Sequence, residues 1–188
     1  MERSAAALQL AYYIRDSRLG RRRLATQTGL TEMTVRIELE RMRDRKLVKL
    51  ERVGAELTSA GRRHYADLLE RVVLVAPIEL TRSLRLGDVA LAARLTSGKS
   101  NPVWALRDAA VRGGASGLLL LRFGAGGWLF AHDGEPVRLR NPEDADRIDA
   151  AFPHPDAGDL LPIVFGPNLK QAGLALWHTV IALLSATL

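Results

Sequence analysis

The pattern of apolar residues at the start of the chain is helical. Between residues 7 and 14 the apolar side chains fall on a single stripe, which predicts a helix over residues 5–15. Gly20 interrupts this pattern, and residues 22–28 predict a short second helix with Leu24 and Ala25 facing inward. The chain is therefore expected to begin with two helices separated by one break.

A turn and a third helix follow directly. Gly29 predicts a tight turn, because glycine adopts a positive φ at little cost. Thr31 predicts the amino-terminal cap of the next helix. Val35, Leu39 and Met42 then recur at helical spacing and define its buried face.

Two short strands and a fourth helix complete the first half. Val48 with Leu50, and Val53 with Leu57, predict a hairpin joined at Gly54. Residue Thr58 predicts the cap of a helix that runs to about Arg71, and Pro77 predicts a boundary. The expected domains are residues 1–75 and 80–188.

The second half alternates strands and helices. The predicted elements are a strand at 88–95, a helix starting at Pro102 with Asn101 as its cap, strands in LLLLRF and WLFAH around the turn GAGG, an acidic helix in NPEDADRIDAAF, a strand in DLLPIVF and a long apolar helix from 166 onward. This order predicts an α+β fold, in which a winged helix-turn-helix precedes a small α/β sandwich with a mixed sheet and helices on one or both faces.

Charge separates the two halves. Residues 1–75 contain 16 Lys and Arg and 10 Asp and Glu, whereas residues 76–188 contain 11 of each kind. The whole net charge of +6 therefore belongs to the first half, which predicts a polyanionic partner for that half alone. The chain has no cysteine, and residues 1–20 carry charges without a clean apolar run, so we expect a cytoplasmic protein without a signal peptide.

The order of the elements in the basic half identifies a motif. Three helices with a tight turn before the third make a helix-turn-helix, and the hairpin with the capped fourth helix makes it winged. The stretch LATQTGLTEMTVRIELERMRDRKLV resembles the helix-turn-helix of bacterial and archaeal winged-helix transcription regulators, and VKLERVGAELTSAG resembles their wing. The resemblance covers roughly residues 5–72 and implies binding of double-stranded DNA, with the third helix in the major groove.

Side-chain roles follow from this arrangement. The first turns of the third helix are expected to contact base edges, the arginines that open the second helix to contact phosphates, and the wing to contact the backbone or the minor groove. The predicted DNA-binding residues are Arg21, Arg22, Arg23, Thr31, Glu32, Met33, Thr34, Arg36, Arg41, Lys49 and Arg52. Two alternatives stay open, namely that the basic face of the third helix around Arg41 is only solvated, and that the domain binds a protein.

The second half shows no catalytic constellation. Its histidines are scattered, GAGG suits a hairpin, and SGKS lacks the first glycine of a phosphate loop, so we expect neither an enzyme nor a cofactor or metal site. A crevice between two strand–helix junctions is a candidate site for a small anionic ligand. Its candidate residues are Lys99, Asn101, Arg107, Asn168 and Lys170, and the alternative is that the asparagines only cap helices.

A second resemblance concerns this half. The stretches WALRDAAVRGGASGLLLLRF and DLLPIVFGPNLKQAGLALWHTVIALL resemble the C-terminal domain of certain archaeal winged-helix proteins, a domain without an assigned activity. Residues 172–188 carry no charge, and we interpret them as a buried helix or a dimer interface rather than a membrane span.

The sequence as a whole predicts a homodimeric transcription regulator with a dimerisation or effector domain. An enzyme or protein-interaction module that docks through its winged helix, and a chromatin-type protein that binds DNA without sequence preference, are the alternatives.

Overall fold

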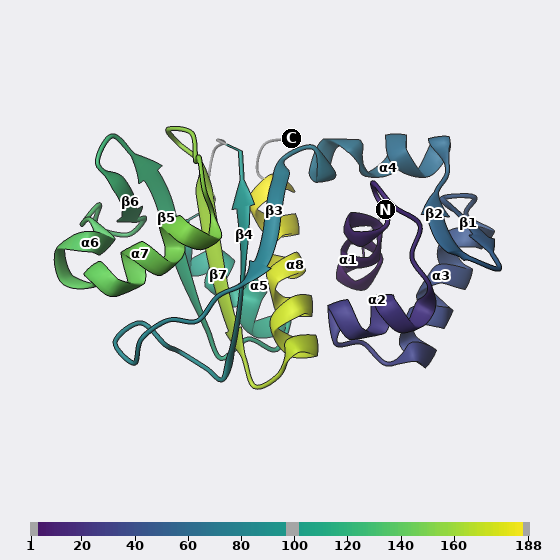
Figure 1. The fold of residues 1–188 in the computed structure, drawn as a ribbon, viewed down its shortest axis with the longest axis horizontal. Coiled ribbons are helices and arrows are strands. Elements are labelled where there is room, and N and C mark those ends of the chain that lie inside the picture. Colours follow the sequence, from purple (N-terminus) through teal and green to yellow (C-terminus); the bar gives the residue numbers. More distant parts are fainter. Residues whose placement is uncertain (1–3, 97–101, 186–188) are drawn as a thin grey trace. The chain divides into compact units, whose positions relative to one another are not determined.

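The computed structural model describes residues 4–96 and 102–185 (Figure 1). The chain divides between Glu70 and Arg71 into two compact units. This division lies a few residues before the expected boundary at 75–80, because the segment in between pairs with the sheet of the second unit.

The first unit is a winged helix. Its elements in chain order are α1 (Ala5–Tyr13), α2 (Arg21–Thr28), α3 (Glu32–Asp44), β1 (Val48–Glu51), β2 (Gly54–Leu57) and α4 (Ser59–Leu69). Val35, Leu39 and Met42 are buried, as their spacing along α3 predicts. Leu24 of α2 and Leu47, just after α3, are buried as well. The predicted order of helices and strands in this half is confirmed.

Local signals set the ends of these helices. Gly29 terminates α2 with a φ of 72°, which is the positive value expected for this turn. The hydroxyl of Thr31 accepts a hydrogen bond from the Thr34 N–H, and that of Thr58 accepts one from the Gly61 N–H. Both predicted caps are therefore confirmed, and α4 ends at Leu69 rather than near residue 71.

The wing turns at a different place than predicted. Strands β1 and β2 pair in antiparallel register from Val48↔Leu57 to Glu51↔Gly54, so the turn consists of Arg52 and Val53 instead of Gly54. Gly54 instead lies against the chain before α2. A Cβ there would lie 2.6 Å from the Leu19 carbonyl group, and its φ is +136°. Glycine at this position therefore lets the wing approach the start of α2 closely.

The second unit contains one antiparallel sheet in its described residues. Its elements are β3 (Val72–Pro77), β4 (Val89–Leu95), α5 (Val103–Arg112), β5 (Gly117–Gly124), β6 (Gly127–Phe130), α6 (Val137–Arg140), α7 (Pro142–Ala151), β7 (Leu160–Gly166) and α8 (Leu169–Ser185). The strand order is β3-β4-β7-β5-β6, and each neighbouring pair is antiparallel. The α+β class is confirmed, whereas the expectation of a mixed sheet is wrong.

The sequence pattern missed strand β3. The run VVLVAP pairs with β4 from Val72↔Leu95 to Pro77↔Leu91 at the edge of the sheet. Three β-branched valines in this run favour a strand, and the edge position tolerates the proline. The helix predicted from Pro102 begins one residue later, with Pro102 as its N-cap residue, and the expected cap Asn101 lies outside the described residues.

Helices cover both faces of the sheet (Figure 1). Helix α8 packs on β4 and β7, and α5 packs on α8 and β5. On the opposite face, Ala145, Ile148 and Phe152 at and just beyond α7 pack in one cluster with residues that include Ile163 and Phe165 of β7. Strand β7 is buried at every position because it is sandwiched between these layers.

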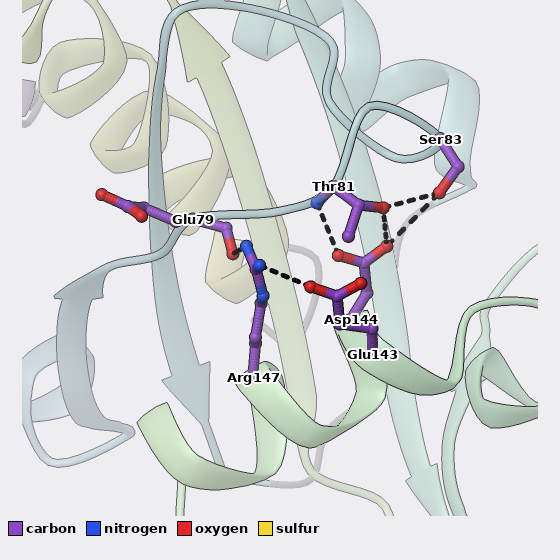
Figure 2. Close-up of polar contacts among 6 residues, drawn as sticks. All are labelled: Glu79, Thr81, Ser83, Glu143, Asp144 and Arg147. Carbon is purple, nitrogen blue, oxygen red and sulfur yellow. Dashed lines mark hydrogen bonds and ion pairs between the residues drawn. The ribbon is translucent and has the colours of Figure 1, made fainter.

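A buried carboxylate fixes the long connection between β3 and β4 (Figure 2). Asp144, in the first turn of α7, accepts hydrogen bonds of 2.6 Å from both the N–H and the hydroxyl of Thr81. The Ser83 hydroxyl lies 3.4 Å from the same carboxylate. Asp144 is almost fully buried, so these donors replace the water that the charge has lost. Arg147 adds a bond from its guanidinium to the carbonyl of Glu79.

We expect Asp144→Ala to destabilise the second unit by about 1–3 kcal/mol, because the substitution leaves the partly buried N–H and hydroxyl of Thr81 without their acceptor. The measurement is the free energy of unfolding from urea denaturation followed by tryptophan fluorescence. The matched control is Glu143→Ala on the same helical turn, whose exposed side chain pairs with Arg147 and whose loss is expected to cost less than about 0.5 kcal/mol. Equal effects of the two substitutions would contradict the prediction.

We expect Gly54→Ala to destabilise the first unit by roughly 2 kcal/mol, because an added methyl group collides with the Leu19 carbonyl at a strained φ. Urea denaturation followed by far-ultraviolet circular dichroism measures the effect. Val53→Ala, at the exposed turn of the same hairpin, is the control and is expected to leave the midpoint unchanged. An unchanged midpoint for Gly54→Ala would show that the wing does not depend on this close approach.

Candidate nucleic-acid interface

The turn between α2 and α3 orients the candidate reading helix. The hydroxyl of Thr28 donates to the Leu24 carbonyl at 2.7 Å and accepts from the Leu30 N–H at 3.2 Å. The Gly29 N–H bonds back to the Ala25 carbonyl at 2.8 Å. These bonds satisfy groups that the helix end leaves free, and they present the amino-terminal half of α3 to solvent.

The predicted DNA-binding residues at the start of α3, including its cap Thr31, lie on the outward side of the helix. Thr31, Glu32, Met33 and Arg36 are exposed, and Thr34 is partly exposed. They lie away from the buried Val35, Leu39 and Met42, as the helical spacing requires. The hydroxyls of Thr31 and Thr34 are 2.9 Å apart and bond to each other.

Charged side chains on α3 form local ion pairs. The Arg36 Nε lies 2.8 Å from a Glu40 carboxylate oxygen, and this hydrogen bond raises the pKa of Arg36 above its already high value. An Arg41 nitrogen lies 2.8 Å from Glu38. Both arginines are exposed, so a phosphate or a base can compete for their guanidinium groups.

The three arginines at the start of α2 (the arginine triplet) lie at the positive end of the helix dipole, which is unfavourable for cations. The N-cap residue Gly20 provides no side-chain hydrogen bond, so N–H groups of the first turn stay available. Three cations at this positive helix end repel one another and the helix dipole. Arg22 lies 3.5 Å from Glu32, whereas Arg21 and Arg23 form no ion pair with any residue that the structure describes. This end of α2 is therefore suited to an anion.

The wing lies beside the start of α2. Leu19 and Ala55 exchange two backbone hydrogen bonds, of 2.8 and 3.2 Å, and so attach β2 to the chain before α2. Arg18 pairs with both strands of the wing, with Glu51 at 2.6 Å and with Glu56 at 2.7 Å. These contacts place the wing and the arginine triplet on one surface of the unit.

A groove of about 370 Å³ runs between α3, the start of α2 and the wing. Its charged and apolar walls include Arg21, Arg36, Leu39, Leu50, Arg52 and Val53. Arg21, Arg36 and Arg52 thus share one groove although the sequence separates them widely. Glu40 and Glu51 also line it, so the groove is not uniformly positive.

The two predicted wing contacts differ in their surroundings. Lys49 lies 2.5 Å from Glu51, which hydrogen-bonds to it and raises its pKa. Arg52, at the turn, forms no ion pair with the described residues. Arg52 is therefore better placed than Lys49 to contact a phosphate.

The sequence prediction left out Ile37. This side chain is 41% exposed and lies one turn after Met33, which is 62% exposed. In the sequence, Ile37 follows Met33 by four residues and falls on the helix face opposite Val35 and Leu39. This spacing could have identified Ile37 as exposed.

The strand ends at which the ligand crevice was predicted lie at opposite ends of the sheet. Strands β4 and β7 are antiparallel, with Val89 opposite Gly166 and Leu95 opposite Leu160. The helices that follow these strands therefore start from opposite ends of the sheet, separated by roughly 20 Å of strand. The predicted crevice between the two junctions is wrong for this reason.

Of the predicted ligand residues, Lys99 and Asn101 lie outside the described residues. Asn168 accepts a hydrogen bond from the Gln171 N–H at 3.0 Å, which supports the alternative that it caps α8. Lys170 and Arg107 are exposed on α8 and α5. In the described parts of the chain, no group of three His, Asp or Glu side chains is arranged to hold a metal ion. None of the described helices has the length and hydropathy needed to span a membrane.

Comparisons with known proteins agree with the two-unit arrangement. Residues 9–73 match the family model of the CggR N-terminal DNA binding domain, which indicates a DNA-binding regulator. No curated protein matches the chain significantly. Among solved structures, hypothetical protein PH0730 from Pyrococcus horikoshii OT3 is similar, with a TM-score of 0.77 over 99% of this chain and 95% of that chain. At 19% sequence identity this likeness shows the fold alone. Residues 87–183, about half of the chain, match a domain of unknown function, and the protein therefore belongs to that family, DUF4443.

Proposed function

We propose that this protein is a transcription regulator that binds duplex DNA through α3 and the wing. The observation that carries the proposal is the surface on which Arg21, Arg36 and Arg52 converge around one groove. In winged helices the recognition helix enters the major groove. A sugar-phosphate strand lying in the groove between α3 and the wing would meet all three guanidinium groups.

The arginines differ in whether they form ion pairs, and this difference supports separate roles in phosphate and base contact. Arg21 and Arg23 form no ion pair within the described chain, and they sit at a helix end with free N–H groups. Phosphate contacts here would relieve the repulsion within the triplet and would not depend on base sequence. Arg36 would have to leave Glu40 to contact a guanine, so its binding depends on the base that it meets.

The second unit offers a surface for a homodimer. Trp104 and Val111, seven residues apart on one face of α5, are 69% and 54% exposed. Tryptophan is enriched at the energetic centres of protein interfaces. A twofold dimer through this face would supply two recognition helices, which on a palindromic operator are spaced about 34 Å apart. Ligand sensing by this unit stays a prediction from the sequence.

We expect DNA affinity to fall steeply with salt, because each phosphate contact releases counterions and contributes about −0.9 to the slope of log K against log salt concentration. Arg21→Ala and Arg23→Ala should each reduce this slope by about one unit and weaken selected and random duplexes alike. Fluorescence anisotropy with labelled duplex at several salt concentrations measures both effects.

The matched control for these substitutions is Arg63→Ala, which removes the same charge from an exposed position on α4. It should leave the slope nearly unchanged. A flat salt response of the unaltered protein, or no binding at low salt, would refute the proposed function. Competition between a selected fragment and random DNA separates a sequence-specific regulator from a chromatin-type protein.

We expect Trp104→Ala to weaken self-association by roughly 30-fold, because truncation of a central aromatic side chain costs about 2 kcal/mol. Light scattering across a micromolar concentration series measures the dissociation constant. Leu139→Ala, which truncates a 72% exposed side chain on α6, should leave it unchanged. A monomer at all concentrations, with and without DNA, would exclude the dimer.

A further inference from the structure

The exposed face of α3 carries an apolar pair among charged residues. Met33 and Ile37 are four residues apart, so they lie next to each other on the face opposite the buried Val35, Leu39 and Met42. Both lie in the first half of the helix, which in a helix-turn-helix approaches the bases. We define Met33 and Ile37 as the apolar pair.

The surroundings of the apolar pair indicate what covers it. Arg22 and Arg36 flank the amino-terminal half of α3, and the arginine triplet of α2 opens onto the same surface. A partner that buries the pair must tolerate this density of positive charge. A nucleic acid meets that condition, whereas an apolar protein surface would leave the arginines desolvated and without acceptors.

The polar side chains around the pair are already engaged. Glu32 lies 3.5 Å from Arg22, and Arg36 lies 2.8 Å from Glu40. The hydroxyls of Thr31 and Thr34 bond to each other. Reading a base through these groups requires that an existing contact be broken. The apolar pair has no such contact to break, and its burial against an apolar group is favourable outright.

We propose that the apolar pair reads the C5-methyl groups of thymines in the major groove. This inference rests on the proposed function. The thymine methyl is the apolar group that B-form DNA displays in the major groove, and apolar side chains recognise it by contact. Four residues of helix rise by about 6 Å, close to two base-pair steps of 3.4 Å. The pair therefore selects thymines about two steps apart on a duplex that α3 follows.

The test uses a duplex selected from a random library for binding to the full chain. Each thymine is replaced singly by deoxyuridine, which removes the methyl group and keeps every base-pair hydrogen bond. We expect one or two positions in each half-site to lose affinity by about four-fold, the value for burial of one methyl-sized group. The remaining thymines should tolerate the exchange.

Protein variants then assign the methyl groups to side chains. Met33→Ala should abolish the difference between thymine and deoxyuridine at one position, and Ile37→Ala should abolish it at the other. Both side chains are exposed, so circular dichroism should show an unchanged fold. Leu139→Ala, which truncates an exposed apolar side chain on α6 outside the winged helix, is the control and should keep both differences.

The outcomes separate this inference from the proposed function. Salt-dependent binding that is indifferent to deoxyuridine at every thymine would overturn the inference and leave the proposed function standing. A thymine preference that persists in both alanine variants would also overturn it, because another residue would then contact the methyl groups. Absence of binding to any duplex at low salt would refute the proposed function itself.

Methylated cytosine carries the same group at the same ring position. Duplexes with cytosine or 5-methylcytosine at the two sensitive positions therefore provide a second arm. Tighter binding of the methylated duplex would support recognition of the methyl group, and equal binding of the two would contradict it. Because thymine is present in all DNA, we assign it as the natural contact.

Discussion

The turn between α2 and α3 is the constraint on which the proposed DNA-binding surface depends. Thr28 is fully buried, and its hydroxyl bonds at once to the Leu24 carbonyl and the Leu30 N–H. Gly29 takes the positive φ that reverses the chain, and Thr31 caps the next helix. Residues 28–31 thus set the direction of α3. The positions of the charged side chains on its outer face therefore depend on this turn.

The charges on that surface fall into two kinds with different consequences. The arginines of α2 cluster at the positive end of a helix whose cap residue supplies no side-chain acceptor. Within the described chain, one ion pair of this triplet, between Arg22 and Glu32, offsets part of the repulsion there. Carboxylates neutralise the arginines of α3 locally, as Glu40 does for Arg36. Under the proposed function, α2 would therefore supply attraction to any DNA sequence, whereas each arginine of α3 would exchange a carboxylate for a DNA group. Affinity and sequence specificity would then come from two different helices.

Short-range physics explains what the sequence could predict. Gly29, Thr31 and Thr58 act through hydrogen bonds and dihedral angles within a few residues, and the burial of Val35 and Leu39 follows from helical spacing. Long-range pairing explains the errors. Residues 72–77 form a strand because they pair with the edge of β4. Strand β7 lies between β4 and β5 and is antiparallel to both, so the sheet is antiparallel and not mixed as predicted. Likewise, Arg21 and Arg52 converge because of the Leu19–Ala55 bridge. This bridge joins residues far apart in the sequence, so local sequence patterns do not predict it.

The antiparallel sheet also argues against the ligand crevice that the sequence predicts in the second unit. Because β4 and β7 run in opposite directions, their following helices cannot share an amino-terminal crevice, and Asn168 serves its own helix. The exposed face of α5 around Trp104 is the surface that we propose for the homodimer. If a second copy covers it, dimerisation and operator binding are thermodynamically linked, since two half-sites favour the paired state and pairing favours both half-sites. Any molecule that alters the packing of α5 would in that case change DNA affinity without touching the winged helix.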